Sequence, residues 1–345
     1  MPALTTGQAE ELKSLRANTK RLLGPTVVLQ LFGGIGTGLA TLLKAGAHVE
    51  KRILVESDME AAKITWCHAE KFPQRYAHQF CKVLMEASAA CGSCDIRNID
   101  EATIRSWGRI DVVISWWECQ GYSRAGEGGG MQYERSRMFR ELVRVLRLIK
   151  RVQGEVLYIV ENVDMEGDVR EKMQAAYEEV TAIMGPGVAA DTAQAGCMTH
   201  RARRYWTNKV SESALQYRLS LMERPVPLFV EVILEVGRMP APMAKLEHPT
   251  QFQCNVVGQP RQAWLTFVSF EETAAFWMQD GAPGPGMVYD CVAQEWQKLT
   301  ALERELQMGF MEDTTVHREV TEKERRRALG RAMDLNAMHW LVATI

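Results

Sequence analysis

Residues 27–38 read VVLQLFGGIGTG, and this stretch decides the fold class. Its first six residues form an apolar run that opens with two β-branched side chains, which predicts a buried strand. Four glycines follow within six residues, so we expect a glycine turn and then a helix over residues 39–45. A strand, a glycine turn and a helix in this order let the backbone approach a bound ligand closely.

Further strand and helix patterns recur along the chain. Apolar strands are predicted at residues 52–55, 111–115 and 156–160, and apolar residues at helical spacing precede the last of them. This alternation predicts a mostly parallel α/β sheet with helices on both faces. Ligands bind such sheets at the carboxyl ends of the strands. The residues that fall there are the 33–38 turn, Glu56, Asp95, Cys119 and Glu161.

The alternation fades after Asn208. Residues 209–292 contain eight prolines and short β-like pieces, whereas Thr300 and Glu303 fit the capping box of a returning helix. We therefore predict a catalytic domain over 1–208, a small inserted domain over 209–292, and a C-terminal part over 293–345 that rejoins the first. A leading helix is expected at 9–23.

Composition limits the function classes. The chain has 345 residues, 46% of them hydrophobic and 24% charged, which excludes a disordered or fibrous protein. No apolar run approaches the roughly 18 residues of a membrane span, and the polar N-terminus favours neither secretion nor a membrane partner. The net charge of −2 means that any basic surface for nucleic acid must be local. The arginines at 325–327 and Arg331 could supply one, although a solvated helix face is the simpler interpretation.

Eight cysteines without a secretory signal indicate reduced thiols, metal ligands or a nucleophile rather than a disulfide framework. One set, which lies in an apparent insertion, has spacing that could hold zinc: His78, Cys81, Cys91 and Cys94. Because their separation is short, a redox pair or a plain loop is favoured, and we expect no metal.

The glycine turn alone does not identify its ligand. Glu56 ends the next strand about 20 residues on, where it could accept hydrogen bonds from ribose hydroxyls. Dinucleotides, nucleosides and S-adenosylmethionine all fit this pattern.

Several ordered motifs together are more specific. They are FGGIGTG (32–38), Glu56, DIRNI (95–99), CQGYS (119–123), Arg135-Ser136 through Phe139, ENV (161–163), HRAR (200–203) with Trp206 downstream, LT…E…MGF (299–310) and LGRA (329–332). In this order they resemble the cytosine-5 DNA methyltransferases, from about residue 26 to 341. The HRAR form and the compact size lean toward the de novo class of eukaryotic enzymes.

The resemblance implies a Rossmann-like methyltransferase sheet with an inserted target-recognition domain, and methyl transfer from S-adenosylmethionine to carbon 5 of cytosine in DNA. Cys119 would attack ring carbon 6 of a flipped-out base, Glu161 would hydrogen-bond the base, and Arg201 and Arg203 would orient it and favour the thiolate. Residues 124–131 would form a loop that closes over the base. The implied cofactor-binding residues are Phe32, Gly33, Gly34, Ile35, Gly36, Thr37, Glu56, Asp95, Ile96, Arg331 and Ala332.

The sequence departs from the family before the nucleophile. Where the family has Gly-Gly-x-Pro-Cys, this chain has SWWEC at 115–119. Glu118 replaces the rigid proline and places a carboxylate beside the thiol, which would raise the pKa of that thiol. Two tryptophans replace small residues near the cofactor.

Three alternatives therefore stay open: an active DNA enzyme, a tRNA cytosine-5 methyltransferase, and a degenerate homologue that binds DNA or stimulates a partner. Residues 209–292 carry six basic and nine acidic residues, a poor charge for reading DNA. A homo-oligomer or a partner methyltransferase also stays open. The expected location is the nucleus in a eukaryote and the cytoplasm otherwise.

Overall fold

The structure is a computed structural model. It describes residues 24–71, 84–87, 95–119, 137–166, 171–192, 201–220, 234–235, 238–240, 278–279, 282–283 and 287–345. The predicted leading helix at 9–23 lies outside these ranges.

A seven-stranded sheet forms the centre of the fold, in the order β3-β2-β1-β4-β5-β7-β6. The strands from β3 to β5 are parallel, and β7 runs antiparallel to both β5 and β6. Their bounds are β1 (Thr26–Leu31), β2 (Val49–Val55), β3 (Leu84–Ala87), β4 (Val112–Trp116), β5 (Leu157–Val163), β6 (Val188–Asp191) and β7 (Ala202–Thr207). The strand order reverses between β1 and β4, so this edge is where an open α/β sheet places its ligand.

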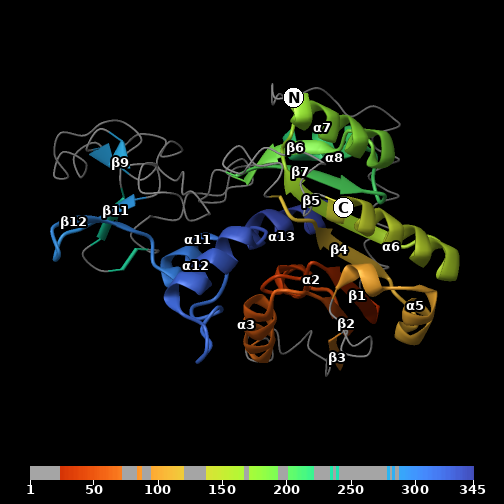
Figure 1. The fold of residues 1–345 in the computed structure, drawn as a ribbon, viewed down its shortest axis with the longest axis horizontal. Helices are drawn as coiled ribbons and strands as arrows, with labels where there is room; N and C mark the ends of the chain where they lie inside the picture. Colours follow the sequence, from red (N-terminus) through yellow and green to blue (C-terminus); the bar gives the residue numbers. More distant parts are fainter. Residues whose placement is uncertain are drawn as a thin grey trace.

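Helices cover both faces of the sheet, as the alternation predicts (Figure 1). Side chains alternate along β1: Val28 packs in one core cluster, while Val27 and Leu29 pack in the other. The first cluster takes residues from α2 (Thr37–Lys44), α11 (Ala301–Gln307) and α13 (Leu335–Thr344). The second takes residues from α5 (Glu101–Trp107), α6 (Met138–Gln153) and α7 (Glu171–Met184).

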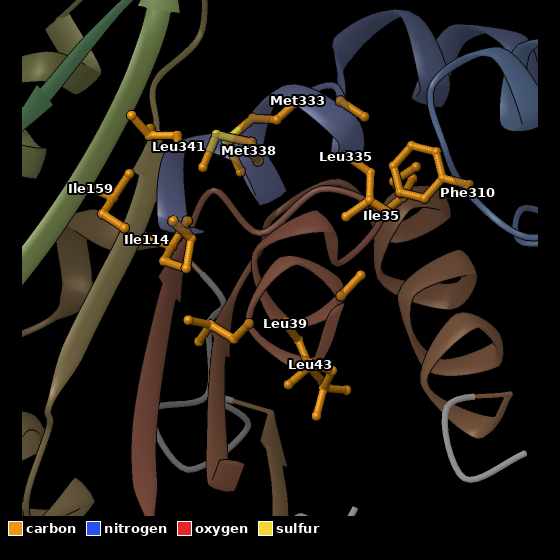
Figure 2. Close-up of a cluster of buried hydrophobic side chains, with 14 of the residues drawn as sticks. Ile35, Leu39, Leu43, Ile114, Ile159, Phe310, Met333, Leu335, Met338 and Leu341 are labelled. Carbon is orange, nitrogen blue, oxygen red and sulfur yellow. The ribbon is translucent and has the colours of Figure 1, made fainter. Parts of the chain in front are cut away.

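The first cluster joins the two ends of the described chain. Figure 2 shows Ile35 and Leu39 of the glycine turn and α2 near Phe310, Leu335 and Met338 of the C-terminal part. The remaining helices are α3 (Met59–Glu70), the short 3-10 helix η2 (Ile96–Asn98), α8 (Glu212–Ser220) and α12 (Glu322–Arg331). Among the described helices, none has the length and apolar character that a bilayer crossing requires.

The capping box predicted at residue 300 is present. The Thr300 hydroxyl accepts from the Glu303 N–H, and the Glu303 carboxylate accepts from the Thr300 N–H, which fixes the start of α11. Gly309 follows the helix with φ of 82°, the left-handed conformation that suits a glycine at a helix end.

A separate three-stranded antiparallel sheet lies beyond α11, formed by β8 (Arg238–Pro240), β11 (Met287–Asp290) and β12 (Glu295–Lys298). A two-stranded pair, β9 (Met278–Gln279) with β10 (Ala282–Pro283), belongs to the same stretch of sequence. Arg238 Nε lies 2.8 Å from Glu303 Oε1, so a buried ion pair ties the small sheet to α11. α8 instead packs Leu215 into the first core cluster. The domain boundaries at 208 and 292 stay a prediction.

Candidate active site

The glycine turn connects β1 to α2 at the edge where the strand order reverses. Gly34 and Gly36 have φ of 49° and 87°, and Phe32, which is half-buried against the second core cluster, has φ of 54°. A side chain at Gly36 would lie 3.3 Å from an Arg52 guanidinium nitrogen, so the turn rests on the residues beneath it. The left-handed geometry and the close contacts explain why glycine occupies these positions.

Glu56 fixes the turn from the end of β2. One carboxylate oxygen accepts from the Gly34 N–H at 2.7 Å, and the other accepts from the Asp58 N–H at 2.7 Å. Burial raises the pKa of Glu56, whereas these backbone hydrogen bonds lower it. Its two oxygens have about four lone pairs between them, and the backbone of Gly34, Asp58 and Ser57 contacts them, so the carboxylate can still accept a ribose hydroxyl.

A buried polar cluster supports the turn from below. The Arg52 Nε donates to Gln30 Oε1 at 2.5 Å, the His68 Nδ1 donates to the Ile35 carbonyl at 2.9 Å, and the Thr65 hydroxyl donates to the Gly34 carbonyl. Burial lowers the pKa of Arg52 to about 9 and that of His68 to about 4. The imidazole is therefore neutral, and the cluster holds the carbonyls of the turn.

Asp95 and Ile96 begin η2 near the same edge. The Asp95 carboxylate accepts from the Arg97 backbone N–H and from its guanidinium, and this partner lowers the pKa of Asp95. Ile96 is buried, and the Arg144 guanidinium of α6 donates to its carbonyl at 2.8 Å. Because Arg97 occupies much of the carboxylate, the assignment of Asp95 to the cofactor site stays a prediction.

Cys119 lies three residues after β4 and is half-buried. Burial raises the pKa of its thiol; Arg203 opposes that shift, the Glu161 carboxylate adds to it, and Arg201 opposes it. The raised pKa agrees in direction with the sequence analysis. Burial is its largest cause and the Glu161 carboxylate adds to it, whereas a contribution from Glu118 stays a prediction.

Glu161 and Arg203 form a nearly buried ion pair beside Cys119. The Arg203 Nε lies 2.8 Å from a Glu161 carboxylate oxygen, and the two side chains are 13% and 8% exposed. Glu161 lies on β5 and Arg203 on the antiparallel β7, whose register places Glu161 opposite Tyr205 and Arg203 opposite Val163. Burial raises the pKa of Glu161 although both Arg203 and Arg201 lower it.

Arg201 is directed toward the C-terminal part of the chain. Its guanidinium donates to the Ala332 carbonyl at 2.7 Å and lies 3.8 Å from the Met308 sulfur. Burial lowers its pKa to about 10. Arg201 thus supplies positive charge to the site while its hydrogen bonds connect β7 to the chain before α13.

Arg331 and its neighbours pair with carboxylates. Arg331 Nη1 lies 3.2 Å from Asp58 at the start of α3, Arg327 lies 3.5 Å from Glu60, and Arg325 lies 3.1 Å from the buried Glu305. Because the Arg325 side chain is only 15% exposed, a solvated helix face is the wrong interpretation for it. The arginines of α12 attach it to α3 and to α11.

The two tryptophans before Cys119 lie on opposite faces of the sheet. Trp117 is fully buried against Phe139 and Trp206, and its carbonyl accepts from the Asn162 side chain at 2.9 Å. Trp116 is half-buried, packs on the first core cluster, and lies against Gly34. In the sequence, these two tryptophans were noticed only because they replace small residues of the family's motif.

Some predicted elements lie outside the described residues: 120–123, the loop at 124–131, Arg135 and Ser136, His200, and the candidate zinc set at 78, 81, 91 and 94. Across the part of the chain that the structure covers, no group of three or more metal-binding side chains is present. The residues that sequence reasoning missed are Gln30, Arg52, Asp58, Thr65 and His68. Arg52 carried a signal, because a charge at the start of an apolar strand segment in a sheet covered on both faces indicates a buried partner.

Comparison with known proteins identifies one matching family model and several solved structures of similar fold. Residues 28–175 match the model of the C-5 cytosine-specific DNA methylases. The Dnmt2 methyltransferase of S. pombe is 16% identical, with a TM-score of 0.55 over 92% of this chain and 97% of that one. The Entamoeba histolytica methyltransferase EhMeth is 12% identical, with a TM-score of 0.54 over 93% and 98%. A prophage-encoded methyltransferase from E. coli is 16% identical, with a TM-score of 0.54 over 92% and 98%.

At these identities the solved structures establish the fold, which confirms the predicted methyltransferase sheet. The range that the family model matches includes the glycine turn, Glu56, Cys119 and Glu161. S-adenosylmethionine, the predicted cofactor, is the methyl donor that this family uses. Over residues 28–175 the chain is therefore similar to the C-5 cytosine-specific DNA methylases, the family that its ordered motifs resemble.

Proposed function

We propose that this protein transfers a methyl group from S-adenosylmethionine to carbon 5 of cytosine in DNA, with Cys119 as the nucleophile. The observation that carries the proposal is the convergence of Cys119 with the buried Glu161–Arg203 pair at one end of the sheet. The glycine turn and Glu56 lie at the same end, on the neighbouring strands β1 and β2.

Cytosine needs activation because its carbon 5 is a weak nucleophile. The Cys119 thiolate adds to carbon 6, and the electron pair of the ring double bond then becomes available at carbon 5. Arg203 and Arg201 both lower the pKa of Cys119, so they favour the thiolate that burial disfavours.

Glu161 is suited to stabilise the activated ring. Burial raises the pKa of its carboxyl group, which therefore keeps a proton at higher pH than an exposed glutamate does. A protonated carboxyl can donate to ring nitrogen 3, and the other oxygen can accept from the exocyclic amine. Its ion pair with Arg203 fixes the orientation of the carboxyl group.

The donor set around the turn fits the cofactor. The Glu56 carboxylate can still accept a further donor, and Thr65 and His68 fix the turn by bonding the Gly34 and Ile35 carbonyls. When bound, S-adenosylmethionine supplies the methyl group that carbon 5 accepts. Loss of the carbon 5 proton and elimination of the Cys119 sulfur then complete the reaction.

A trapping experiment tests the proposal. Duplex DNA with 5-fluorocytosine and S-adenosylmethionine should give a band that survives denaturation, because fluorine blocks the final proton removal and Cys119 stays attached. Cys119→Ala should lose the band, whereas Cys291→Ala, which changes an exposed cysteine of the small sheet's turn, should keep it.

Two outcomes would overturn the proposal. A band with 5-fluorocytosine tRNA and none with DNA of varied sequence would assign RNA as the substrate. No band with either nucleic acid, while S-adenosylmethionine still binds, would indicate a homologue without catalysis.

A further inference from the structure

Trp116 lies between the proposed cofactor site at the glycine turn and the proposed base site at Glu161. It is the last residue of β4, and β4 lies between β1, which leads into the glycine turn, and β5, which carries Glu161. The parallel register places Trp116 directly beside Glu161. A methyl group that moves from a cofactor at the turn to a base at Glu161 must cross the end of β4.

The indole ring reaches the glycine turn. A Cβ built on Gly34 would lie 2.5 Å from Trp116 Cζ2 and 3.0 Å from Cη2, so the six-membered ring packs on the Gly34 backbone. This Gly34 is the residue whose N–H Glu56 holds. Trp116 packs on the first core cluster but is only half-buried, so the residue keeps some accessible surface.

The charges around this position make an aromatic residue useful. The transferable methyl group sits on a sulfonium cation, and the nearby cations Arg201 and Arg203 disfavour another positive charge. The adjacent carboxylate of Glu161 is already paired with Arg203. A tryptophan face attracts a cation through its quadrupole without forming a competing salt bridge to the arginines.

We propose that Trp116 is a cofactor-binding residue that recognises the sulfonium charge, and so distinguishes S-adenosylmethionine from its uncharged product S-adenosylhomocysteine. The proposal rests on the assigned cofactor and concerns binding alone, so it does not depend on which nucleic acid is methylated. Loss of the methyl group removes the positive charge, which weakens the contact and favours release of the product.

Isothermal titration calorimetry with three ligands tests this. S-adenosylmethionine and sinefungin, whose protonated amine replaces the sulfonium methyl group, are cations at that position, whereas S-adenosylhomocysteine is neutral. Trp116→Leu should weaken both cationic ligands by about 2- to 30-fold and the neutral one by less than twofold. Trp116→Phe keeps a weaker aromatic face and should fall between.

Trp66→Leu is the matched control, because it removes an exposed indole from α3 and should leave the ratio of the affinities unchanged. Equal weakening of all three ligands would overturn the proposal and assign Trp116 a packing role. Tighter binding of all three would also overturn it, because the ring would then be filling the site. If Trp116→Leu fails to fold, the shift in the Trp116→Phe ratio decides, and an unchanged ratio there refutes the proposal.

Discussion

Replacing Arg203 with methionine would remove the cation that faces Glu161 while keeping an unbranched side chain. The two side chains are 13% and 8% exposed and lie 2.8 Å apart. Breaking a pair this well buried leaves a carboxylate without compensation, which costs about 3–5 kcal/mol of unfolding free energy. With a urea m-value of about 3 kcal/mol/M, the unfolding midpoint should fall by about 1–1.7 M.

The pH dependence should identify the cause. Burial already raises the pKa of Glu161, and removal of Arg203 should raise it further. A carboxyl group whose folded pKa is raised contributes stability that is fully present below its unfolded pKa and lost as the pH rises through the folded pKa. The deficit of Arg203→Met should therefore be large at pH 8 and shrink toward pH 5.

Urea unfolding followed by circular dichroism would measure these values. Adding Glu161→Gln to Arg203→Met should recover at least half of the deficit, because the carboxylate that lost its partner is then gone. Arg140→Met breaks the more exposed Arg140–Glu179 pair and should cost less than about 1 kcal/mol. The reasoning is refuted if the Arg203→Met deficit is no larger than this control, or if the two changes at the pair simply add.

Three further outcomes follow from the described contacts. His68 has a folded pKa of about 4, below its unfolded value, so its stability contribution is present above about pH 6.5 and lost as the pH falls toward 4. That loss is about 3 kcal/mol, and His68→Gln should flatten the corresponding slope in urea unfolding between pH 7 and pH 4. Thr300→Ala removes the capping box of α11 and should cost about 1 kcal/mol in thermal unfolding; an unchanged unfolding temperature would show that the cap does not stabilise this helix. Gly34→Ala introduces a Cβ 2.5 Å from an indole carbon at φ of 49°, so it should lower stability by about 1–3 kcal/mol and weaken S-adenosylmethionine in calorimetry; unchanged binding would exclude the turn from the cofactor site.

Much of the fold could be predicted from local patterns. The apolar residues 27–31 predict a strand, and the glycines after them predict a turn, without any information from distant parts of the chain. The capping box at Thr300 and Glu303 is likewise local and matches the structure. No local sequence pattern predicts the contacts between distant segments. Nothing in the sequence links Arg201 to the Ala332 carbonyl, or shows that Arg97 pairs with Asp95 instead of leaving it open.

The causes of the pKa shifts in the site could likewise not be predicted from the sequence. The sequence drew attention to the adjacent Glu118, whereas the largest influence on the Cys119 thiol is burial, followed by charges from Arg203 on β7 and Glu161 on β5. A pKa depends on the three-dimensional surroundings of a group, and neighbours in the chain are only part of them.

The contact between Arg201 and the Ala332 carbonyl can form only late in synthesis, after residue 332 has been added to the chain. The first core cluster combines β1 and α2 with α11 and α13, so its earliest side chains emerge from the ribosome long before their packing partners. At about 5–20 residues per second, that interval is on the order of ten seconds or more. Throughout it, one face of the nascent sheet stays uncovered, which makes it a target for chaperones. Cys119 is translated early, whereas Arg201, which lowers the pKa of its thiol, gains its Ala332 contact only after residue 332 has been made.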